Sequence, residues 1–239
     1  MILSLDMAHK RKLGYRFESD NPDSMRNAVE VLYRKAVTVP VDVEIEGEQR
    51  VLSYDNVKEI LLNASRISLV DCECRTKRHN CDKPVRVCIG INGKADQILN
   101  SVEDDEGWPG ILNPQEIGVD EALSALMKSH EAGLVHMALT RNKDTRPEDI
   151  DYVCSCCTCC CGPLGGIVRY GMAPHLLTSD KKSVTDTQAC NDCGICEDRC
   201  QFGAREIVNG SLVFNPDLCF GCSLCVSICP TNAITLVDK

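Results

Sequence analysis

Apolar residues recur at helical spacing in three segments of the first 133 residues. This spacing places them on one face of a helix, so we predict an amphipathic helix in each segment. Asn21 and Pro22 favour the start of the first helix, and Gly133 favours the end of the third. The predicted helices cover residues 22–36, 57–64 and 119–130.

Strands are predicted where apolar residues alternate with polar ones or form short runs. Apolar residues alternate with acidic ones over residues 41–45, as in a half-buried strand. Short apolar runs over 67–70 and 134–139 predict two more strands, and the first ends just before Cys72. The acidic, Gly- and Pro-containing stretch 101–118 predicts a solvated loop. This part of the chain is therefore expected to mix helices and strands.

Cysteine divides the chain into two units. The sequence has 239 residues and 18 Cys, none of them before Cys72. The cysteines fall into three groups, over residues 72–88, 154–161 and 190–229. A polar, turn-rich stretch over residues 178–188 predicts a connector. The fold class expected is α+β, with a cysteine-rich domain over residues 1–178 and a small domain over residues 184–239.

Composition restricts the function classes. The net charge of −9 argues against nucleic-acid binding and favours basic partner surfaces. No apolar run approaches the roughly 18 residues of a membrane-spanning helix, and the N-terminus lacks a signal-peptide pattern. We therefore expect a cytoplasmic protein, in which thiols stay reduced and dense Cys indicates metal binding. The apolar share of 44% includes Cys, so part of the core is expected to be inorganic.

The C-terminal unit contains a duplicated cysteine motif. The run C-x2-C-x2-C-x3-C occurs twice, and matched Cys are 29 residues apart. This is the ferredoxin-type spacing, in which the fourth Cys of each run binds the other cluster. Zinc ribbons use paired C-x2-C knuckles and do not fit this spacing. We predict two [4Fe–4S] clusters, one bound by Cys190, Cys193, Cys196 and Cys229, the other by Cys219, Cys222, Cys225 and Cys200.

The segment between the two motifs predicts a hairpin over residues 207–213, with Asn209 and Gly210 in its turn. This C-terminal part resembles bacterial two-cluster ferredoxins. It departs from them at Gln201, where the family usually has the proline seen here at Pro230.

The other ten cysteines lie in a C-x-C-R…C-x2-P-x3-C segment and a C-x-C-C-x-C-C-C segment, separated by the Gly133–His136 element. With the ferredoxin motifs, these segments make residues 40–239 resemble the 4Fe–4S dicluster, ferredoxin-type proteins of anaerobes. The resemblance implies the class of cofactor and no particular reaction. We expect these ten Cys to bind one or two additional clusters: Cys72, Cys74, Cys81, Cys88, Cys154, Cys156, Cys157, Cys159, Cys160 and Cys161.

Backbone geometry limits how the six crowded Cys can act. In an extended chain residues 154, 156 and 160 would face one way, and 157, 159 and 161 the other. In a helix 154, 157 and 161 would share one face, and 156 and 160 another. In either case the six cannot all bind one cluster, and two cubanes would leave two of the ten Cys spare.

Other roles for these segments stay open. Cys72, Cys74, Cys81 and Cys88 have spacing compatible with a zinc site, and adjacent Cys pairs at 156–157 or 159–160 could be redox-active thiols. Arg75 and Lys83 could donate hydrogen bonds to cluster sulfurs, or be ordinary surface cations. His136 lies in a predicted apolar strand and is more typical of a structural histidine than of a ligand.

These observations favour a multi-cluster electron-transfer protein, a component of a larger anaerobic oxidoreductase rather than a stand-alone enzyme. Its expected partners are redox proteins, and no nucleotide or flavin motif is present. One alternative is an iron–sulfur reductase subunit acting at Cys154–Cys161. Another is a ferredoxin with a zinc-stabilised docking domain.

Overall fold

The computed structural model describes residues 35–39, 60–100, 112–140, 150, 152–161, 164–165, 176–177, 179 and 181–238. The predicted strand over 41–45 lies outside these residues, as does most of the predicted helix over 22–36. The last two residues of that helix, Lys35 and Ala36, instead begin a strand. All five residues of this strand pair with a second strand over residues 136–140. These strand contacts stabilise an extended backbone, although the apolar residues are spaced as in a helix.

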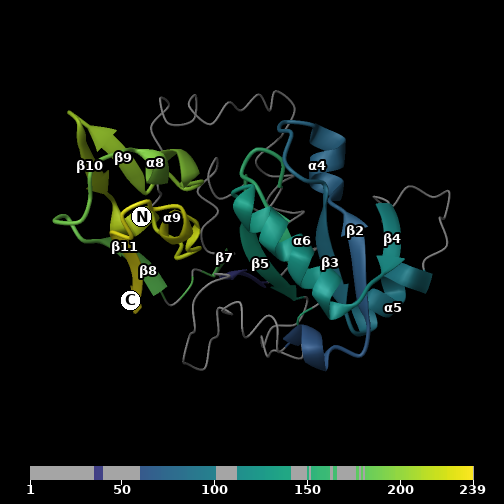
Figure 1. Cartoon of the computed structure of the whole chain (residues 1–239). Coiled ribbons are helices and arrows are strands. Elements are labelled where there is room, and N and C mark those ends of the chain that lie inside the picture. The colour runs from purple at the N-terminus through teal and green to yellow at the C-terminus, as the bar shows by residue number, and fades with distance from the viewer. Residues whose placement is uncertain are drawn as a thin grey trace.

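One mixed sheet organises the described part of the chain before residue 178 (Figure 1). Its strands are β1 (Lys35–Val39), β2 (Ile67–Asp71), β3 (Arg86–Ile91), β4 (Leu112–Glu116), β5 (Val135–Thr140), β6 (Tyr152–Cys156) and β7 (Leu176–Leu177). They lie in the order β4-β2-β3-β6-β5-β1-β7. Every neighbouring pair is antiparallel except β1 and β7. Because β3 pairs with β6, two segments about 65 residues apart in the sequence lie side by side.

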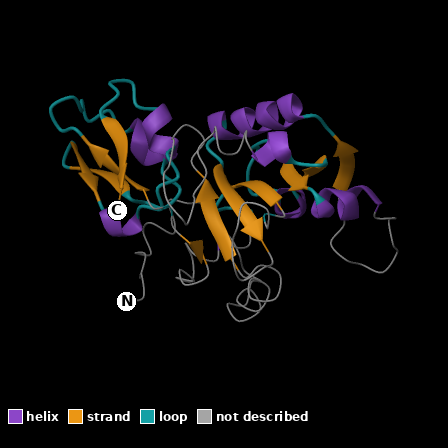
Figure 2. Cartoon of the chain, turned by 90° about the horizontal axis from the view of Figure 1, so that it is seen from below, coloured by secondary structure: helices purple, strands orange, loops and turns teal. Residues whose placement is uncertain are grey.

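The helices with defined bounds beside this sheet are α4 (Glu73–Arg78), α5 (Gly93–Asn100) and α6 (Val119–Glu131). Helix α6 packs across β2, β3, β5 and β6, and Figure 2 shows helices along one side of the strands. The buried Leu123 and Leu126 of α6 share a core with Ile89 and Ile91 of β3. The predicted helix over 119–130 is confirmed, and Gly133 follows it with a φ of 74°, where glycine is favoured.

The predicted loop over 101–118 was wrong in its last part, because β4 occupies Leu112–Glu116 and pairs with β2. β4 is at the edge of the sheet, and the side chains described in it are exposed. Such a strand needs no alternating apolar pattern. The predicted strands over 67–70 and 134–139 are confirmed as β2 and β5. Residues 60–63 of the helix predicted over 57–64 are helical.

The C-terminal module contains two small sheets and short helical segments. Its elements are β8 (Lys181–Thr185), α8 (Ile195–Arg199), β9 (Arg205–Val208), β10 (Ser211–Phe214), the 3-10 turn η3 (Pro216–Leu218), α9 (Leu224–Ser227) and β11 (Ile234–Asp238). β9 pairs with β10 through a turn in which Asn209 and Gly210 have positive φ, so the predicted hairpin is confirmed. β8 pairs with β11, so the predicted connector over 178–188 contains a strand. Among the described helices, none is long and apolar enough to cross a membrane.

Candidate metal centres

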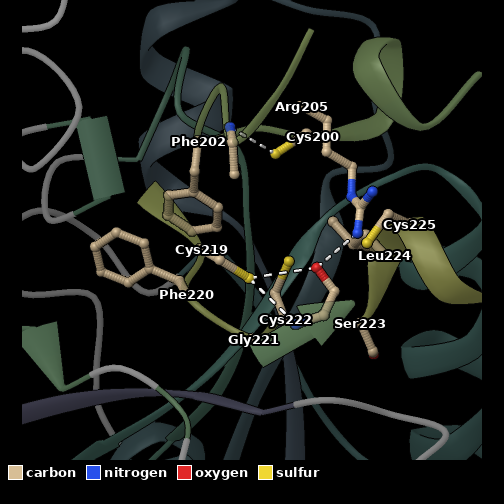
Figure 3. Close-up of a pocket in the computed structure, with 12 residues that line it drawn as sticks. Cys200, Phe202, Arg205, Cys219, Phe220, Gly221, Cys222, Ser223, Leu224 and Cys225 are labelled. Atoms are coloured by element: carbon tan, nitrogen blue, oxygen red, sulfur yellow. Dashed lines mark hydrogen bonds between the residues drawn. The ribbon is translucent and has the colours of Figure 1, made fainter. Parts of the chain in front are cut away.

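The second set of ferredoxin-type cysteines surrounds one cavity in the C-terminal module (Figure 3). Cys200 comes from the first motif, whereas Cys219, Cys222 and Cys225 come from the second. The cavity contains about 330 Å³ of space free of protein atoms, part of it open to solvent. Four thiols from two crossed motifs around one cavity are the donor set and the space that a cubane requires. These residues therefore fit a [4Fe–4S] cluster.

Backbone and side-chain donors face the sulfurs of this set. Ala204 donates its backbone N–H to the Cys200 sulfur at 3.3 Å, and the Ser183 N–H lies 3.5 Å from the Cys219 sulfur. The Ser183 hydroxyl is at the same distance from the Cys219 sulfur. Hydrogen bonds to the sulfurs tune the reduction potential of iron–sulfur clusters. The loops therefore supply candidate ligands together with donors placed to tune a bound cluster.

Gly221 explains how the second motif approaches β8. Its φ is 69°, and a Cβ atom at this position would lie 2.1 Å from the carbonyl oxygen of Lys181. Only glycine satisfies both the backbone conformation and the contact. The glycine thus brings the loop that contains Cys222 against the start of the module.

The first ferredoxin-type set is arranged more openly. Cys196, at the start of α8, is buried and packs with Ile234 and Cys229. Cys190 lies close enough to affect the pKa of the Cys196 thiol, whereas Cys193 is exposed. The structure thus packs Cys196 into one cluster with Cys229 and leaves Cys193 at the surface.

Arg205 lies between the two ferredoxin-type sets, and the sequence analysis missed it. Its side chain is 1% exposed and donates to Thr185 Oγ1 at 2.6 Å and to Ser183 Oγ at 2.9 Å. Burial raises the pKa of both the Cys196 and Cys225 thiols, while the Arg205 charge opposes that shift. No spacing rule marks an arginine in a short strand, because its role depends on contacts with β8.

In the N-terminal sheet, six cysteines form a closed ring of thiol contacts, called the ring below. Each of these thiols interacts with two others of the set. The contacts join Cys72 to Cys88, Cys88 to Cys154, Cys154 to Cys156, Cys156 to Cys161, Cys161 to Cys74 and Cys74 to Cys72. The sheet produces this closure, because β3 pairs with both β2 and β6.

The ring changes the acidity of its members. Hydrogen bonds with Cys74 and Cys88, together with burial, raise the pKa of the Cys72 thiol above its ordinary value. Hydrogen bonds from Cys154 and Cys72 lower the pKa of Cys88 despite the opposing effect of burial. Six neighbouring buried or half-buried thiols are a candidate metal site, since a bound metal ion deprotonates its thiol ligands.

The other four N-terminal cysteines form a compact group, called the tetrad below. Three of them come from the turn after β6 and one from the loop after α4. All four sulfurs lie within 4.8 Å of one another: Cys81, Cys157, Cys159 and Cys160. Ten cysteines therefore divide into a ring of six and a tetrad.

This division differs from the predicted side-chain directions of the six Cys over residues 154–161. Cys154 and Cys156 do share a face, as the alternation of an extended chain requires. The strand ends at Cys156, however, and residues 158–160 form a turn. Cys160 therefore belongs to the tetrad and Cys161 to the ring, the reverse of what a continuous strand would give. The helical arrangement was also wrong.

Two other expectations for the N-terminal Cys were also wrong. The zinc site of Cys72, Cys74, Cys81 and Cys88 does not form as a unit, because Cys81 lies in the tetrad and the other three lie in the ring. The adjacent pair at 156–157 is likewise divided between the ring and the tetrad. The pair at 159–160 stays together, with its sulfurs 3.9 Å apart.

Arg75 lies between the ring and the tetrad. It is 2% exposed and donates to the Ser155 carbonyl at 3.1 Å and to the Cys157 sulfur at 3.5 Å. A hydrogen bond from Cys159 and the charge of Arg75 lower the pKa of the Cys157 thiol to about 4, although burial opposes this shift. Arg75 is therefore not a surface cation, and it donates to one of the ten candidate ligand sulfurs; a bond to a cluster sulfur stays a prediction. Lys83 instead donates to the Gly133 carbonyl at 3.3 Å.

Gln201 connects the C-terminal module to the turn of the tetrad. Its Oε1 accepts from the Thr158 N–H at 2.7 Å, and its Nε2 donates to the carbonyls of Gly133 and Cys156. Gln201, which replaces the proline usual in ferredoxins at this position, thus makes buried hydrogen bonds. Proline could provide neither the acceptor nor the donor.

A pair of stacked histidines also spans the two regions. The His130 and His136 rings lie 5.7 Å apart, with an angle of 10° between their planes. His136 is fully buried and bonds to Ser155 Oγ at 3.0 Å, while His130 Nε2 lies 2.7 Å from Ser227 Oγ of α9. Burial and the neighbouring His130 lower the pKa of His136 to about 3. His136 is therefore neutral at physiological pH, as expected of a structural histidine.

Comparison with known proteins agrees with the geometry of the C-terminal module. Residues 212–235 match the family described as "4Fe-4S binding domain". Pyruvate synthase subunit PorD of Methanocaldococcus jannaschii is 39% identical over 59 residues, which cover 24% of this chain and 69% of PorD. The chain belongs to the family of 4Fe–4S ferredoxin-like proteins.

A second relative of this ferredoxin-like protein covers a similar length. It is an uncharacterized ferredoxin of the same organism, 38% identical over 52 residues, which are 21% of this chain and 31% of that ferredoxin. Each match spans about a quarter of the ferredoxin-like protein or less.

Proposed function

We propose that this ferredoxin-like protein is a multi-cluster electron carrier that acts as a subunit or dedicated partner of a larger anaerobic oxidoreductase. Its C-terminal module holds two [4Fe–4S] clusters on the predicted sets of Cys. The ring holds a further iron–sulfur cluster. When bound, such clusters take up and release one electron at a time. The chain buries them, orients them and supplies hydrogen bonds to their sulfurs.

One observation carries this proposal: thiols of the two regions pack into the same buried cluster. Cys200 and Cys222 of the C-terminal module pack against the group that contains Cys154, Cys156 and Cys161 of the ring. Electron transfer between clusters slows steeply with distance, so neighbouring ligands favour exchange. Gln201 follows Cys200 directly and bonds to the Cys156 carbonyl. Ligands of both sites are thus joined through the protein as well as by packing.

Two charged side chains support an electron-carrying role. Arg75 adjoins the N-terminal thiols, and Arg205 lies between the ferredoxin-type sets; both are buried. A buried cation favours the reduced, more negative state of a neighbouring cluster, because it stabilises added negative charge. Arg75, whose charge acts on Cys72 and Cys156 of the ring, and Arg205 therefore adjust the potentials of the ring and of the ferredoxin-type sites.

The partner is inferred from charge and similarity. The net charge of −9 favours docking on a basic protein surface. PorD is, by its name, a subunit of pyruvate synthase, and it is similar to 59 residues of this chain. Both observations support a role beside a larger oxidoreductase.

Anaerobic metal analysis combined with EPR of the reduced protein tests this function. Two ferredoxin-type cubanes and one cubane in the ring predict about 12 iron atoms per chain. A triple variant with Ala at Cys154, Cys156 and Cys161 loses at least one ligand whichever four ring thiols bind, so its count should fall to about eight while the ferredoxin-type signals remain. The matched variant Cys222→Ala should remove iron from the C-terminal module and leave that of the ring. A count of about eight that the triple variant does not change would show that the ring binds no cluster.

The ring also favours a second candidate function, reduction of a substrate at the Cys154–Cys161 segment. A single cubane uses four thiols, so a ring of six would leave two buried thiols beside the cluster. Single Cys→Ser variants of all six ring positions test this candidate. The two variants that retain all iron should lose partner-dependent reduction of the substrate yet still accept electrons. Unchanged reduction in both variants would leave electron transfer as the function.

A further inference from the structure

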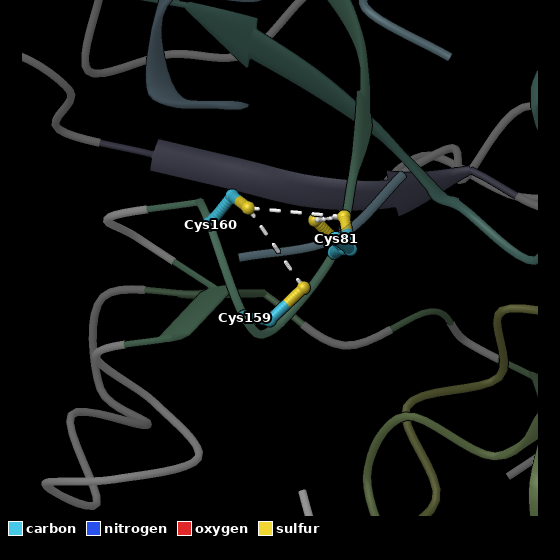
Figure 4. A group of neighbouring side chains, drawn as sticks. Cys81, Cys159 and Cys160 are labelled. Carbon is cyan, nitrogen blue, oxygen red and sulfur yellow. Dashed lines mark hydrogen bonds between the residues drawn. The ribbon is translucent and has the colours of Figure 1, made fainter. Parts of the chain in front are cut away.

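The tetrad has the dimensions of a site for one metal ion. The Cys81 sulfur lies 3.8 Å from the sulfurs of both Cys157 and Cys160, and the Cys159 and Cys160 sulfurs are 3.9 Å apart (Figure 4). A tetrahedron with zinc–sulfur bonds of about 2.3 Å has edges of about 3.8 Å. The spacing of the sulfurs therefore matches four thiolates around a single zinc ion.

The C-terminal module provides an internal comparison. A cubane binds each thiolate to a different iron atom, which separates the four sulfurs more widely than one ion does. No three of the four sulfurs that line the cavity, those of Cys200, Cys219, Cys222 and Cys225, lie within 4.8 Å of one another. Within the described part of the chain, only the tetrad brings three or more potential ligand atoms within 4.8 Å of one another. The tetrad thus has the compact spacing of a site for one ion, whereas the cavity in the C-terminal module has the size of a site for a cluster.

The surroundings of the tetrad are those of a closed, structural site. Four thiolates complete the tetrahedral coordination of zinc and leave no position for substrate or water. One zinc ion with four thiolates has a net charge of −2, and the buried Arg75 guanidinium offsets part of it at the Cys157 sulfur. Arg78 donates to the Cys160 carbonyl at 2.7 Å and Asn80 to the Cys159 carbonyl at 2.9 Å. These bonds orient the turn independently of the metal.

We propose that Cys81, Cys157, Cys159 and Cys160 bind a single zinc ion in tetrahedral coordination. The ion joins the loop after α4 to the turn after β6, two segments 76 residues apart in sequence. The turn is flanked by Cys156 and Cys161 of the ring, so the zinc ion fixes the chain on both sides of the turn. The site involves no thiol of the ring or of the ferredoxin-type motifs. It therefore does not depend on the proposed electron-transfer function.

Metal analysis and zinc X-ray absorption of the full chain, purified anaerobically from iron-supplemented cells, test the proposal. The expected result is about one zinc per chain, with four sulfur neighbours at about 2.3 Å. Cys81→Ser and Cys160→Ser should each lower bound zinc at least about five-fold and leave the iron content within about a tenth of the parent value. The control Cys222→Ser should lose iron and keep its zinc.

Three results would overturn the zinc assignment. They are a chain without zinc, oxygen or nitrogen neighbours around the zinc, or loss of iron in Cys81→Ser. The absorption measurement uses the unaltered protein, so the proposal stays testable if a variant fails to fold. A failure here leaves the iron count of the triple ring variant unaffected. The zinc proposal and the electron-transfer proposal can therefore fail separately.

Discussion

The eight C-terminal and ten N-terminal cysteines are brought together by different means. In the C-terminal module each motif places three Cys within seven residues, and only the fourth comes from the other motif. In the N-terminal sheet the tetrad joins Cys81 to Cys157, 76 residues further along the chain. Closing a loop of 76 residues instead of three costs about 3 kcal/mol more in chain entropy. The N-terminal groups therefore depend on a sheet that offsets this cost.

The two regions depend on different contacts for their stability. A C-terminal loop is shaped by local conformation, such as the positive φ of Gly221. The ring and the tetrad are shaped by long-range contacts, such as those of Arg75 and Gln201. Substitutions at these positions should thus affect stability in different ways.

The largest effect is expected from Arg75→Met. The variant loses a buried charge that bonds to two carbonyls and one sulfur, and it should destabilise the fold by about 3–5 kcal/mol. Anaerobic urea denaturation followed by circular dichroism measures this change. Lys77→Ala on the same helix is the control, because its exposed ion pair with Glu73 contributes about 0.5 kcal/mol or less. Similar losses in the two variants would contradict a central role for Arg75.

Gly221→Ala should have the next largest effect, about 3 kcal/mol or more. It combines a strained positive φ with a collision between the new Cβ and the Lys181 carbonyl. The control is Gly210→Ala, where φ is 83° but the space around the glycine is open. That variant should lose only about 1 kcal/mol. The same denaturation assay compares them, and equal losses would show that the approach of the loop to β8 is unimportant.

Gln201→Ala should cost about 2 kcal/mol, because it leaves the buried Thr158 N–H without its acceptor. It should also weaken the magnetic coupling between clusters of the two regions in EPR spectra of the reduced protein. Gln188→Ala, at an exposed position, serves as the control and should change neither property. Loss of stability with unchanged coupling would restrict Gln201 to a structural role.

The smallest effect concerns pH. His136 has a pKa of about 3 in the folded chain, whereas an unfolded histidine has one of about 6.5. Acid therefore protonates the unfolded chain first, and stability should fall by about 1.4 kcal/mol per pH unit below pH 6. His136→Gln should lack this contribution, so the stability difference between parent and variant should shrink from pH 7 to pH 5.5. Urea midpoints at the two pH values measure it, and a constant difference would contradict the buried neutral state.

Much of the fold could be predicted where local pattern and tertiary contacts agree. Helix α6 and strands β2 and β5 have apolar faces that pack in the core, and the Asn209–Gly210 turn has its own backbone signature. Strands β4 and β8 were missed because few of their side chains are buried. In β8 only Ser183 is buried, and it is polar. Such strands form because a neighbour offers hydrogen bonds, which no local pattern reveals.

The sequence by itself determined the family, through cysteine spacings short enough for one loop to bring three thiols together. It also identified all ten N-terminal Cys as candidate ligands. Only the tertiary structure decided how those ten divide into the ring and the tetrad. The pairing of β3 with β6 places Cys88 beside Cys154, and the end of β6 at Cys156 assigns Cys160 and Cys161 to different groups. The physical reason is that periodicity describes the faces of one continuous element, whereas these sites form between elements far apart in sequence.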